Sequence, residues 1–350
     1  MLRSFLFPLK APATRQRGFS LVELMVGITV GLIVIATVAL VFATSSRARR
    51  EMAKTAQQVE NGRYASQVLI DDFRLAGYYG ELNPTTLTPP YSPLLSMPDP
   101  CATALATLNG MPSQLLMPVQ GYDNAATIPS CLLDVKAGTD IVAIRRTSTC
   151  VAGTSGCDPV NTSLYTYFQT HLCATQILPP YVIGSSGFTG TQMDCVTPAV
   201  LRSYYTRIYF VANNNQPNDG IPTLKVAELG SGSFTISPLV AGIDQMQIEY
   251  GVETTVGQPA VYTANPSTYN GCSSATCQIA NWENVITAKI HILARNTQSS
   301  QAFTDTRTYV LGKLADGVTN NVYGPFNDAY KRHVYTTVVR LNNVAGRRGE

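Results

Sequence analysis

The feature that most constrains this chain is a run of twenty uncharged residues, Leu24–Ala43, close to its N-terminus. At ~1.5 Å of helical rise per residue, such a run spans the hydrocarbon core of a bilayer. A single carboxylate, Glu23, stands immediately before the run. A charge beside lipid is costly and is usually kept for a function. The sequence therefore predicts one membrane-spanning helix with a functional acid at its N-terminal end.

An ordinary secretory signal and a plain single-span anchor are the two alternatives. A secretory signal has a shorter apolar run followed by a small-residue cleavage site, which Ala43-Thr44-Ser45 matches only loosely. An ordinary secretory signal also has no use for Glu23. The basic residues do not decide the orientation, because four stand on each side of the span (Arg3, Lys10, Arg15 and Arg17 before it; Arg47, Arg49, Arg50 and Lys54 after it).

The helix is expected to continue beyond the apolar run. Proline is absent from Arg47 to Ala76, and apolar residues recur at helical spacing there (Met52, Ala56, Val59, Ala65, Val68, Leu69, Phe73 and Ala76). Gly77 suits a C-terminal cap, and Gly62 is an interior weakness of about 1 kcal/mol relative to alanine. We predict one helix from about Phe19 to Ala76, with its second half amphipathic and packed on a globular head.

The head is predicted to consist mainly of β-strands. Alternation and β-branched or aromatic residues predict strands at 140–146, 201–212, 223–229, the second half of 239–252, 286–294 and 333–341. A turn-rich segment, 213–220, predicts a hairpin between the second and third of these. Residues 83–139 are expected to be mostly loop, and the stretch to about Thr197 irregular. His291 falls on the polar face of its strand. The predicted fold class is α+β, a long helix packed on an antiparallel β-sheet head.

Eight cysteines all lie beyond the apolar run, and an even number in an exported domain favours disulfides. Eight cysteines allow 105 connectivities. Our hypothesis pairs sequence neighbours: Cys150–Cys157, Cys272–Cys277, Cys101–Cys131 and Cys173–Cys195. Zinc is the rival, but the short gaps and the scattered His171, His291 and His333 do not match zinc-site spacing. We expect no metal and no other cofactor.

No catalytic pattern is present in the sequence. It has no G-x-S-x-G, no Gly-rich phosphate loop and no H-E-x-x-H. Asp71 and Asp72 are neighbours on a helix and therefore point in different directions, so they cannot act as paired carboxylates. We interpret them as two solvated charges and expect no enzyme.

Residues 17–23, Arg-Gly-Phe-Ser-Leu-Val-Glu, and the apolar helix after them resemble the processing and methylation site of type IV pilins and type II secretion pseudopilins. The resemblance implies cleavage after Gly18 by a prepilin peptidase on the cytoplasmic side and N-methylation of Phe19. It also implies that Glu23 docks one subunit onto another in a helical fibre. The chain would then comprise a cleaved leader (1–18), a transmembrane half-helix (19–43), an amphipathic half-helix (44–77) and a periplasmic or extracellular head (78–350).

Segments in the C-terminal part, including YFVANNN, LVAGIDQMQIEYGV, NWENVITAKIHILARN and KRHVYTTVVRLNNVAGRR, together with 59–80 resemble the PilW family of minor type IV pilins. The family implies a low-abundance subunit that joins other minor pilins and the major pilin in an initiating complex near the pilus tip. It would lie in the inner membrane before assembly and in the surface pilus afterwards. A minor pseudopilin of type II secretion and a tip-adhesive subunit are the alternatives. A tip adhesin is a further partner that the resemblance implies.

The leader carries four basic residues and no acid, so its removal takes the formal net charge from +3 to −1. A near-neutral chain gives no electrostatic reason to expect a nucleic-acid partner.

Overall fold

The computed structural model describes residues 18–86, 94–110, 112–175 and 179–347. All of the expected leader except Gly18 lies outside these ranges. Contacts divide the chain into two compact units, residues 1–53 and 54–350. The second unit, which includes the end of the long helix, holds all the strands and the hydrophobic core.

Helix α1 runs without interruption from Leu21 to Leu75, so the predicted single helix is confirmed. It ends because Gly77 adopts a left-handed backbone, with φ of +75°, as expected of a capping glycine. The Gly77 N–H then bonds to the Arg145 carbonyl, 3.0 Å away, instead of to a carbonyl of the helix. The cap therefore also ties the helix end to a neighbouring strand.

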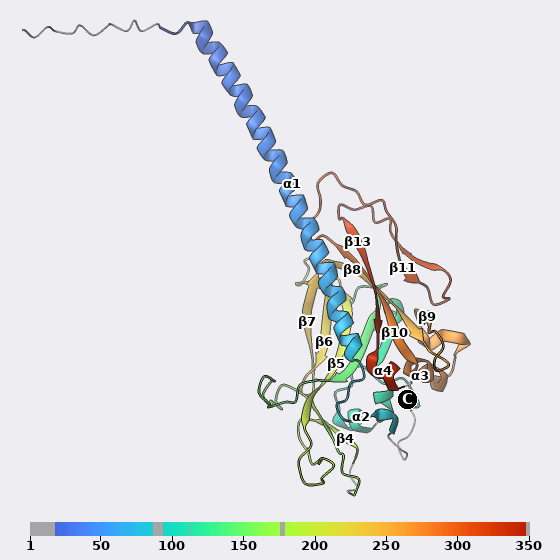
Figure 1. Ribbon diagram of the computed structural model, residues 1–350. Coiled ribbons are helices and arrows are strands. Elements are labelled where there is room, and N and C mark those ends of the chain that lie inside the picture. The colour runs from blue at the N-terminus through green and yellow to red at the C-terminus, as the bar shows by residue number, and fades with distance from the viewer. Residues whose placement is uncertain (1–17, 87–93, 111, 176–178, 348–350) are drawn as a thin grey trace, which may run out of the picture. The chain divides into compact units, whose positions relative to one another are not determined.

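The larger sheet is antiparallel and has seven strands. Four of them, β4, β5, β6 and β7, are labelled in Figure 1. The strand order of this sheet is β1-β2-β5-β3-β4, and β6 pairs with both β5 and β7. The bounds are β1 Val119–Tyr122, β2 Ile141–Thr147, β3 Tyr167–Thr170, β4 Tyr181–Gly184, β5 Leu201–Ala212, β6 Thr223–Leu229 and β7 Phe234–Ala241. The hairpin predicted across 213–220 is confirmed by the pairing of β5 with β6.

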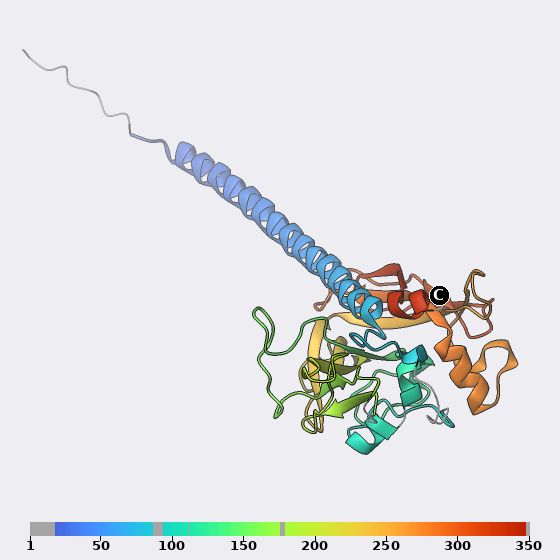
Figure 2. The ribbon, with the colours of Figure 1, turned by 60° about the horizontal axis from the view of Figure 1, so that its bottom comes forward.

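The second sheet has the order β13-β10-β8-β9, and a separate two-stranded sheet joins β11 to β12. The bounds are β8 Ile243–Val252, β9 Val261–Thr263, β10 Val285–Arg295, β11 Tyr309–Lys313, β12 Asn320–Tyr323 and β13 Arg332–Arg340. Short helices complete the chain: α2 Leu105–Gly110, α3 Ala275–Glu283, α4 Asn342–Arg347, and the 3-10 helices η1 Pro84–Thr86, η2 Pro112–Leu116, η3 Asp123–Ala125 and η4 Pro266–Gly271. Figure 2 shows the segments before β5, in teal and green, gathered on one side of the orange and red C-terminal strands.

The main core forms where the last turns of α1 meet both sheets. Ala65, Leu69 and Phe73 of the helix are completely buried, in one cluster with Ile248 of β8 and Ile290 of β10. Burial of large aliphatic and aromatic side chains supplies about 1.5–3 kcal/mol each. The apolar face of the second half of the helix thus packs against both sheets and joins them. The predicted α+β fold class is confirmed.

Seven strands were not predicted. Three of them, β9, β11 and β12, fall in segments between predicted strands. β1 lies within the expected loop, β3 and β4 within the expected irregular region, and β7 before the predicted strand in 239–252. β1, β3 and β4 have only four residues each, too few for a period-2 pattern to be visible. β7 contains Pro238, which is tolerated because β7 is an edge strand.

Candidate functional site

The expected processing positions lie just outside the start of α1. Gly18, Phe19 and Ser20 precede the helix, and the Ser20 carbonyl accepts the N–H of Leu24 at 3.1 Å. The Phe19 side chain is 84% exposed. The Gly18–Phe19 peptide bond is therefore in exposed, non-helical backbone, just before the regular helix begins at Leu21.

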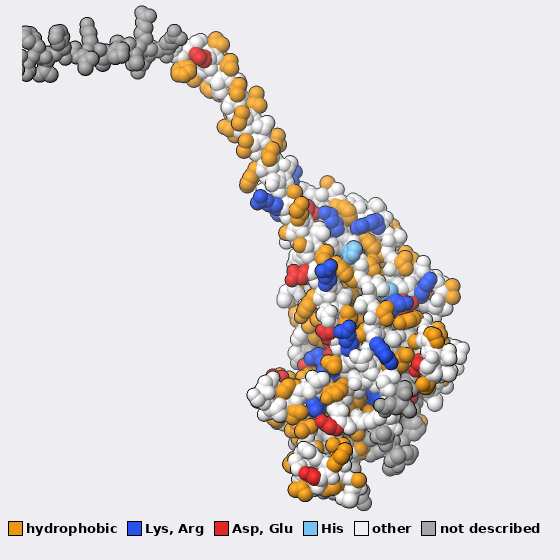
Figure 3. Space-filling view, in the orientation of Figure 1, with side chains coloured by type: hydrophobic (Ala, Val, Ile, Leu, Met, Phe, Trp, Pro, Cys, Tyr) orange, Lys and Arg blue, Asp and Glu red, His pale blue; other side chains and the backbone are white. Residues whose placement is uncertain are grey.

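Beyond this point, large apolar side chains from Leu21 to Phe42 are exposed. Figure 3 shows hydrophobic side chains distributed along the visible face of this part of the helix. The helix is long and apolar enough to cross a membrane, by length and composition. The hydroxyls of Thr29 and Thr37 donate to the carbonyls of Val26 and Val34, at 2.9 and 2.8 Å. These bonds satisfy the hydroxyls within the helix, so neither needs water.

Glu23 lies in the first turn of α1. The free N–H groups of a helix start give that end a partial positive charge, which favours a carboxylate there. Among its immediate neighbours, Leu21, Val22, Leu24 and Met25 are all exposed apolar residues. The carboxylate is thus an isolated acid in an apolar surface, on a different turn from Phe19.

The amphipathic part of α1 is anchored to both sheets by two buried or half-buried amides. Gln58 Nε2 donates to the carbonyls of Ala294 in β10 and Lys331, at 2.8 and 2.9 Å. Asn61 Nδ2 donates to the Ala241 carbonyl at the end of β7, at 2.9 Å. These bonds fix the rotation of the helix about its axis, which apolar packing alone does not specify as tightly.

Gly62 is needed for packing, although glycine has a low helix propensity. A Cβ at this position would lie 2.1 Å from Cε2 of Tyr335 in β13. The aromatic ring therefore lies directly against the helix backbone. The interior glycine, which the sequence suggests is only a weakness, is the residue that lets β13 approach α1.

The prediction that Asp71 and Asp72 are two solvated charges is wrong for Asp72. Asp71 is exposed, but Asp72 is only 4% exposed. Its Oδ1 accepts from Arg146 Nη2 at 2.6 Å and Arg207 Nη1 at 3.1 Å, and its Oδ2 accepts from Tyr209 Oη at 2.5 Å. Burial and the negative charge of Asp72 raise the pKa of Tyr209. The neighbouring aspartates point in different directions, and the partners of Asp72 lie on β2 and β5.

His291 lies on the polar side of β10 as predicted, but this side is buried. Its Nε2 is 2.9 Å from Glu249 Oε2, and its Nδ1 is 3.0 Å from Thr336 Oγ1. Gly312 of β11 covers the pair so closely that a Cβ there would lie 2.8 Å from the Glu249 carboxylate. Burial acts to raise the pKa of Glu249, but the hydrogen bond from His291 and the charge of Lys289 hold it below its usual value. The sheet of β11 and β12 lies over this pair, and this is why the polar side of β10 is buried.

A buried ionic cluster around Arg332 was not predicted. The guanidinium is 1% exposed and bonds to Asp244 at 2.7 Å, Asp305 at 3.1 Å and Asp328 at 2.7 Å. Phe326 lies under it, 3.7 Å from ring centroid to guanidinium carbon. The three carboxylates come from β8 and from the segments on either side of β11 and β12, so Arg332 joins distant parts of the chain. No local sequence signal marks such a cluster, because its members are 4 to 88 residues from Arg332.

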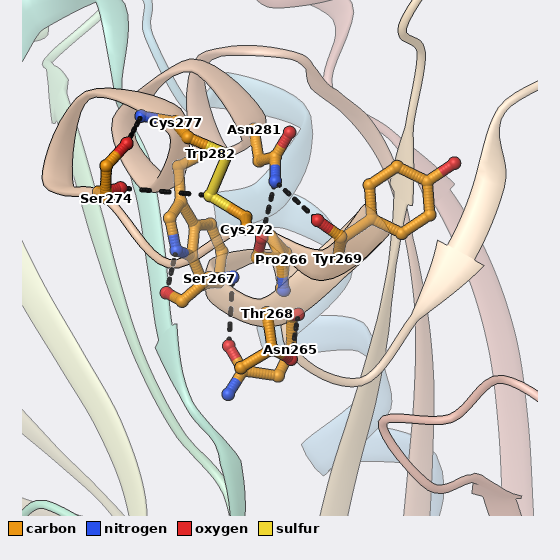
Figure 4. Close-up of a disulfide and its surroundings, with 10 residues drawn as sticks. All are labelled: Asn265, Pro266, Ser267, Thr268, Tyr269, Cys272, Ser274, Cys277, Asn281 and Trp282. Carbon is orange, nitrogen blue, oxygen red and sulfur yellow. Dashed lines mark hydrogen bonds between the residues drawn. A yellow bond between two sulfur atoms is a disulfide. The ribbon is translucent and has the colours of Figure 1, made fainter.

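All eight cysteines form disulfides, and the pairs are those of the sequence-neighbour hypothesis: Cys101–Cys131, Cys150–Cys157, Cys173–Cys195 and Cys272–Cys277. Figure 4 shows the last of these beside the start of α3. There the Ser274 hydroxyl caps the helix by accepting the Cys277 N–H at 3.3 Å. Trp282 Nε1 donates to Ser267 Oγ at 2.9 Å, which holds η4 against α3.

Within the described ranges, no three histidine, cysteine, aspartate or glutamate side chains gather in a way that could hold a metal ion.

Two family models match parts of the chain. Residues 13–39 match the prokaryotic N-terminal methylation motif, and residues 208–343 match the family described as Type IV Pilus-assembly protein W, PilW. A type IV-like pilin from Thermus thermophilus aligns with 82% of this chain and 97% of its own, at 12% identity and a TM-score of 0.31. No curated protein sequence matches the chain.

The methylation motif and the apolar helix define the chain as a type IV pilin-like protein. More particularly, it carries a PilW domain, which extends from β5 to the start of α4. The resemblance stated from the sequence is thereby confirmed.

Proposed function

We propose that this protein is a minor type IV pilin that helps to initiate pilus assembly, within a complex of minor pilins near the tip. The observation that carries the proposal is the combination of an exposed apolar helix, residues 21–42, with a PilW domain in the same chain. The helix supplies the common means of polymerisation, and the domain distinguishes this subunit from others.

The size of the head supports a tip-proximal position. The second unit extends from residue 54 to 350 and contains two sheets, a separate β11–β12 pair and four disulfides. A repeated shaft subunit must pack closely with neighbours above, below and beside it. A head of this size is easier to place where few subunits stack above it.

The N-terminal segment supports processing and membrane insertion before assembly. We infer that a prepilin peptidase cleaves after Gly18, that Phe19 becomes the methylated N-terminus, and that the helix then anchors the subunit in the inner membrane with the head in the periplasm. Docking on other pilins would use Glu23, whose carboxylate has an amine partner available at the N-terminus of a neighbouring subunit.

A minor pseudopilin of type II secretion would carry the same kind of anchor. The match of residues 208–343 to a pilus-assembly family favours the pilus. A tip-adhesive subunit is the third candidate, supported by the exposed apolar side chains of Met193 and Val196 on either side of the disulfide-bonded Cys195.

Deletion of the gene, followed by electron microscopy and quantitative labelling, tests the proposal. A priming subunit predicts far fewer pili, and those that form keep their normal diameter. Complementation with a labelled copy should place the protein at low copy number near the tip.

Normal pilus number with a loss of protein secretion would favour the pseudopilin. Normal pilus number with a loss of adhesion would favour the adhesive subunit. Dense labelling along the whole filament would refute the priming role.

A further inference from the structure

A cavity of about 490 Å³ lies between three segments of the head, well away from the N-terminal site in sequence. Its walls are residues 97–100, residues 120–123 with 126–130, and Asn265 with Ser267. The volume is within the range of about 300–1,000 Å³ that is usual for small-ligand sites. Neither the membrane helix nor the proposed docking through Glu23 uses this cavity.

The walls of the cavity are held in place covalently and by hydrogen bonds. The Cys101–Cys131 disulfide joins the segment after Pro100 to the segment after Ser130. The third wall is fixed by the Asn265 side chain, which accepts the Ser267 N–H at 3.0 Å, and by the bond from Trp282 to Ser267 (Figure 4). A ligand would therefore meet groups that are already ordered, which lowers the entropic cost of binding.

The charged residues that line the cavity are all acidic. Asp99 and Asp123 line the cavity, and none of the lining residues is lysine, arginine or histidine. Asp123 is half-buried and accepts a bond from the neighbouring Asn124 side chain, at 2.8 Å, but it forms no ion pair with any residue of the described ranges. Burial without a cation raises the pKa of Asp123. A desolvated carboxylate of this kind gains from a positively charged partner.

The remaining groups suit a cation that has an apolar stem. The Tyr122 ring lines the cavity, and an aromatic face attracts ammonium and guanidinium groups. Its hydroxyl accepts a hydrogen bond from Gln120 Nε2 at 2.8 Å, and part of its ring packs on the core cluster that contains Ile141. The part of the ring that lines the cavity is therefore the group that a ligand would meet. Met97, Pro98 and Ile128 add apolar contact for a stem.

We propose that this cavity is a binding site for a basic side chain, an arginine or lysine presented by a partner protein. The ammonium or guanidinium group would pair with the Asp123 carboxylate and contact the Tyr122 ring, while Asp99 adds a second negative charge at the wall. The site is distinct from the assembly surface of the helix and gives the head a means of recognising a specific neighbour.

The test uses the full chain in detergent micelles and ligand-observed NMR. The probe is N-acetyl-arginine amide, and the matched control ligand is N-acetyl-citrulline amide, which has nearly the same shape but no charge. We expect the arginine probe to bind at least tenfold more tightly than citrulline. Asp123→Asn should weaken arginine binding at least tenfold, whereas Asp71→Asn, the same change at an exposed site, should leave it unchanged.

Equal affinity for the two probes, no binding of either, or unchanged binding by Asp123→Asn would overturn the proposal. Thermal unfolding shows whether Asp123→Asn is folded. If it is not, Asp99→Asn, which keeps the oxygen that accepts the Cys101 N–H, decides the question by the same comparison. Saturable calcium binding that excludes the arginine probe would make a divalent cation the occupant and would also overturn the proposal.

Discussion

At the scale of single residues, the head depends on polar and small residues whose partners are remote in sequence. Gly62 permits Tyr335 to lie against α1, and Asp72 meets partners 74 to 137 residues away. From sequence alone, a glycine in a helix and an aspartate next to another aspartate look like a weak point and a solvated charge. Their roles depend on which strand folds back against the helix, and local pattern does not contain that information.

Asp72→Asn is expected to destabilise the head strongly. The change leaves the buried Arg146 and the half-buried Arg207 beside a neutral amide. Removing one partner of a buried ionic group costs about 3–5 kcal/mol. Asp71→Asn is the control, because its side chain is exposed and such substitutions usually fall within about 0.5 kcal/mol. Denaturant unfolding of the full chain in detergent measures both. Equal effects of the two substitutions would show that the cluster contributes little.

The Arg332 cluster predicts a dependence of stability on pH. Burial acts to raise the pKa of Asp244, but Lys136 and Arg332 hold it below its usual value, and the bonds from Arg332 lower the pKa of Asp328. A carboxyl whose pKa is lower in the folded state than in the unfolded state, where it is ~3.9, stabilises the fold above that pH. This contribution is lost as the pH falls through the folded-state pKa.

Arg332→Met should therefore cost about 3–5 kcal/mol at pH 7, and the difference from the native chain should shrink below about pH 4. Arg307→Met is the control, because Arg307 is largely exposed and an exposed pair contributes about 1 kcal/mol or less. Unfolding temperatures measured from pH 7 to pH 3 give the result. A loss that stays constant with pH would assign the effect to packing on Phe326 rather than to charge.

At the scale of elements, the long and strongly patterned ones were predictable. The helix, β5, β6, β10 and β13 agree with the sequence within about two residues at each end, because each has a sustained hydrophobic period or a clear cap. The short strands β1, β3 and β4 form because β2 and β5 are already present to pair with them or because they pair with one another. Their formation follows from the sheet rather than from their own four residues.

The disulfides are expected to differ in their contribution according to the length of chain that each closes. Cys101–Cys131 closes 30 residues and Cys272–Cys277 closes five. Loop-closure entropy then predicts a loss of about 3–4 kcal/mol when both cysteines of the first pair become alanine, and about 2 kcal/mol for the second. Denaturant unfolding of the two double variants tests the order. A reversed order would show that contacts around η4 and α3, rather than chain entropy, dominate.

At the scale of the whole molecule, the exposed apolar helix and the folded core belong to different units of the chain. The apolar helix residues that suit a membrane or a fibre core belong to residues 1–53, while the core, the buried ion pairs and the disulfides belong to residues 54–350. The sequence predicts a boundary after residue 43 from its long uncharged run and a disulfide-bonded head from its eight cysteines, whereas the two units divide after residue 53. It could not predict the cavity beside Tyr122, because three segments far apart in sequence form its walls.

Glu23 provides the sharpest test of this division of tasks. We expect Glu23→Ala and Glu23→Gln to leave the unfolding temperature of the head and the amount of protein in the membrane unchanged, because Glu23 belongs to the first unit. Incorporation into sheared pili should fall about tenfold or more, since losing even 1.4 kcal/mol of docking energy lowers an association constant tenfold. Glu60→Ala, which removes an exposed carboxylate from the second half of the same helix, is the matched control. Normal incorporation of both Glu23 variants would mean that subunits dock through apolar contacts alone, and that the acid at the start of the helix serves processing rather than assembly.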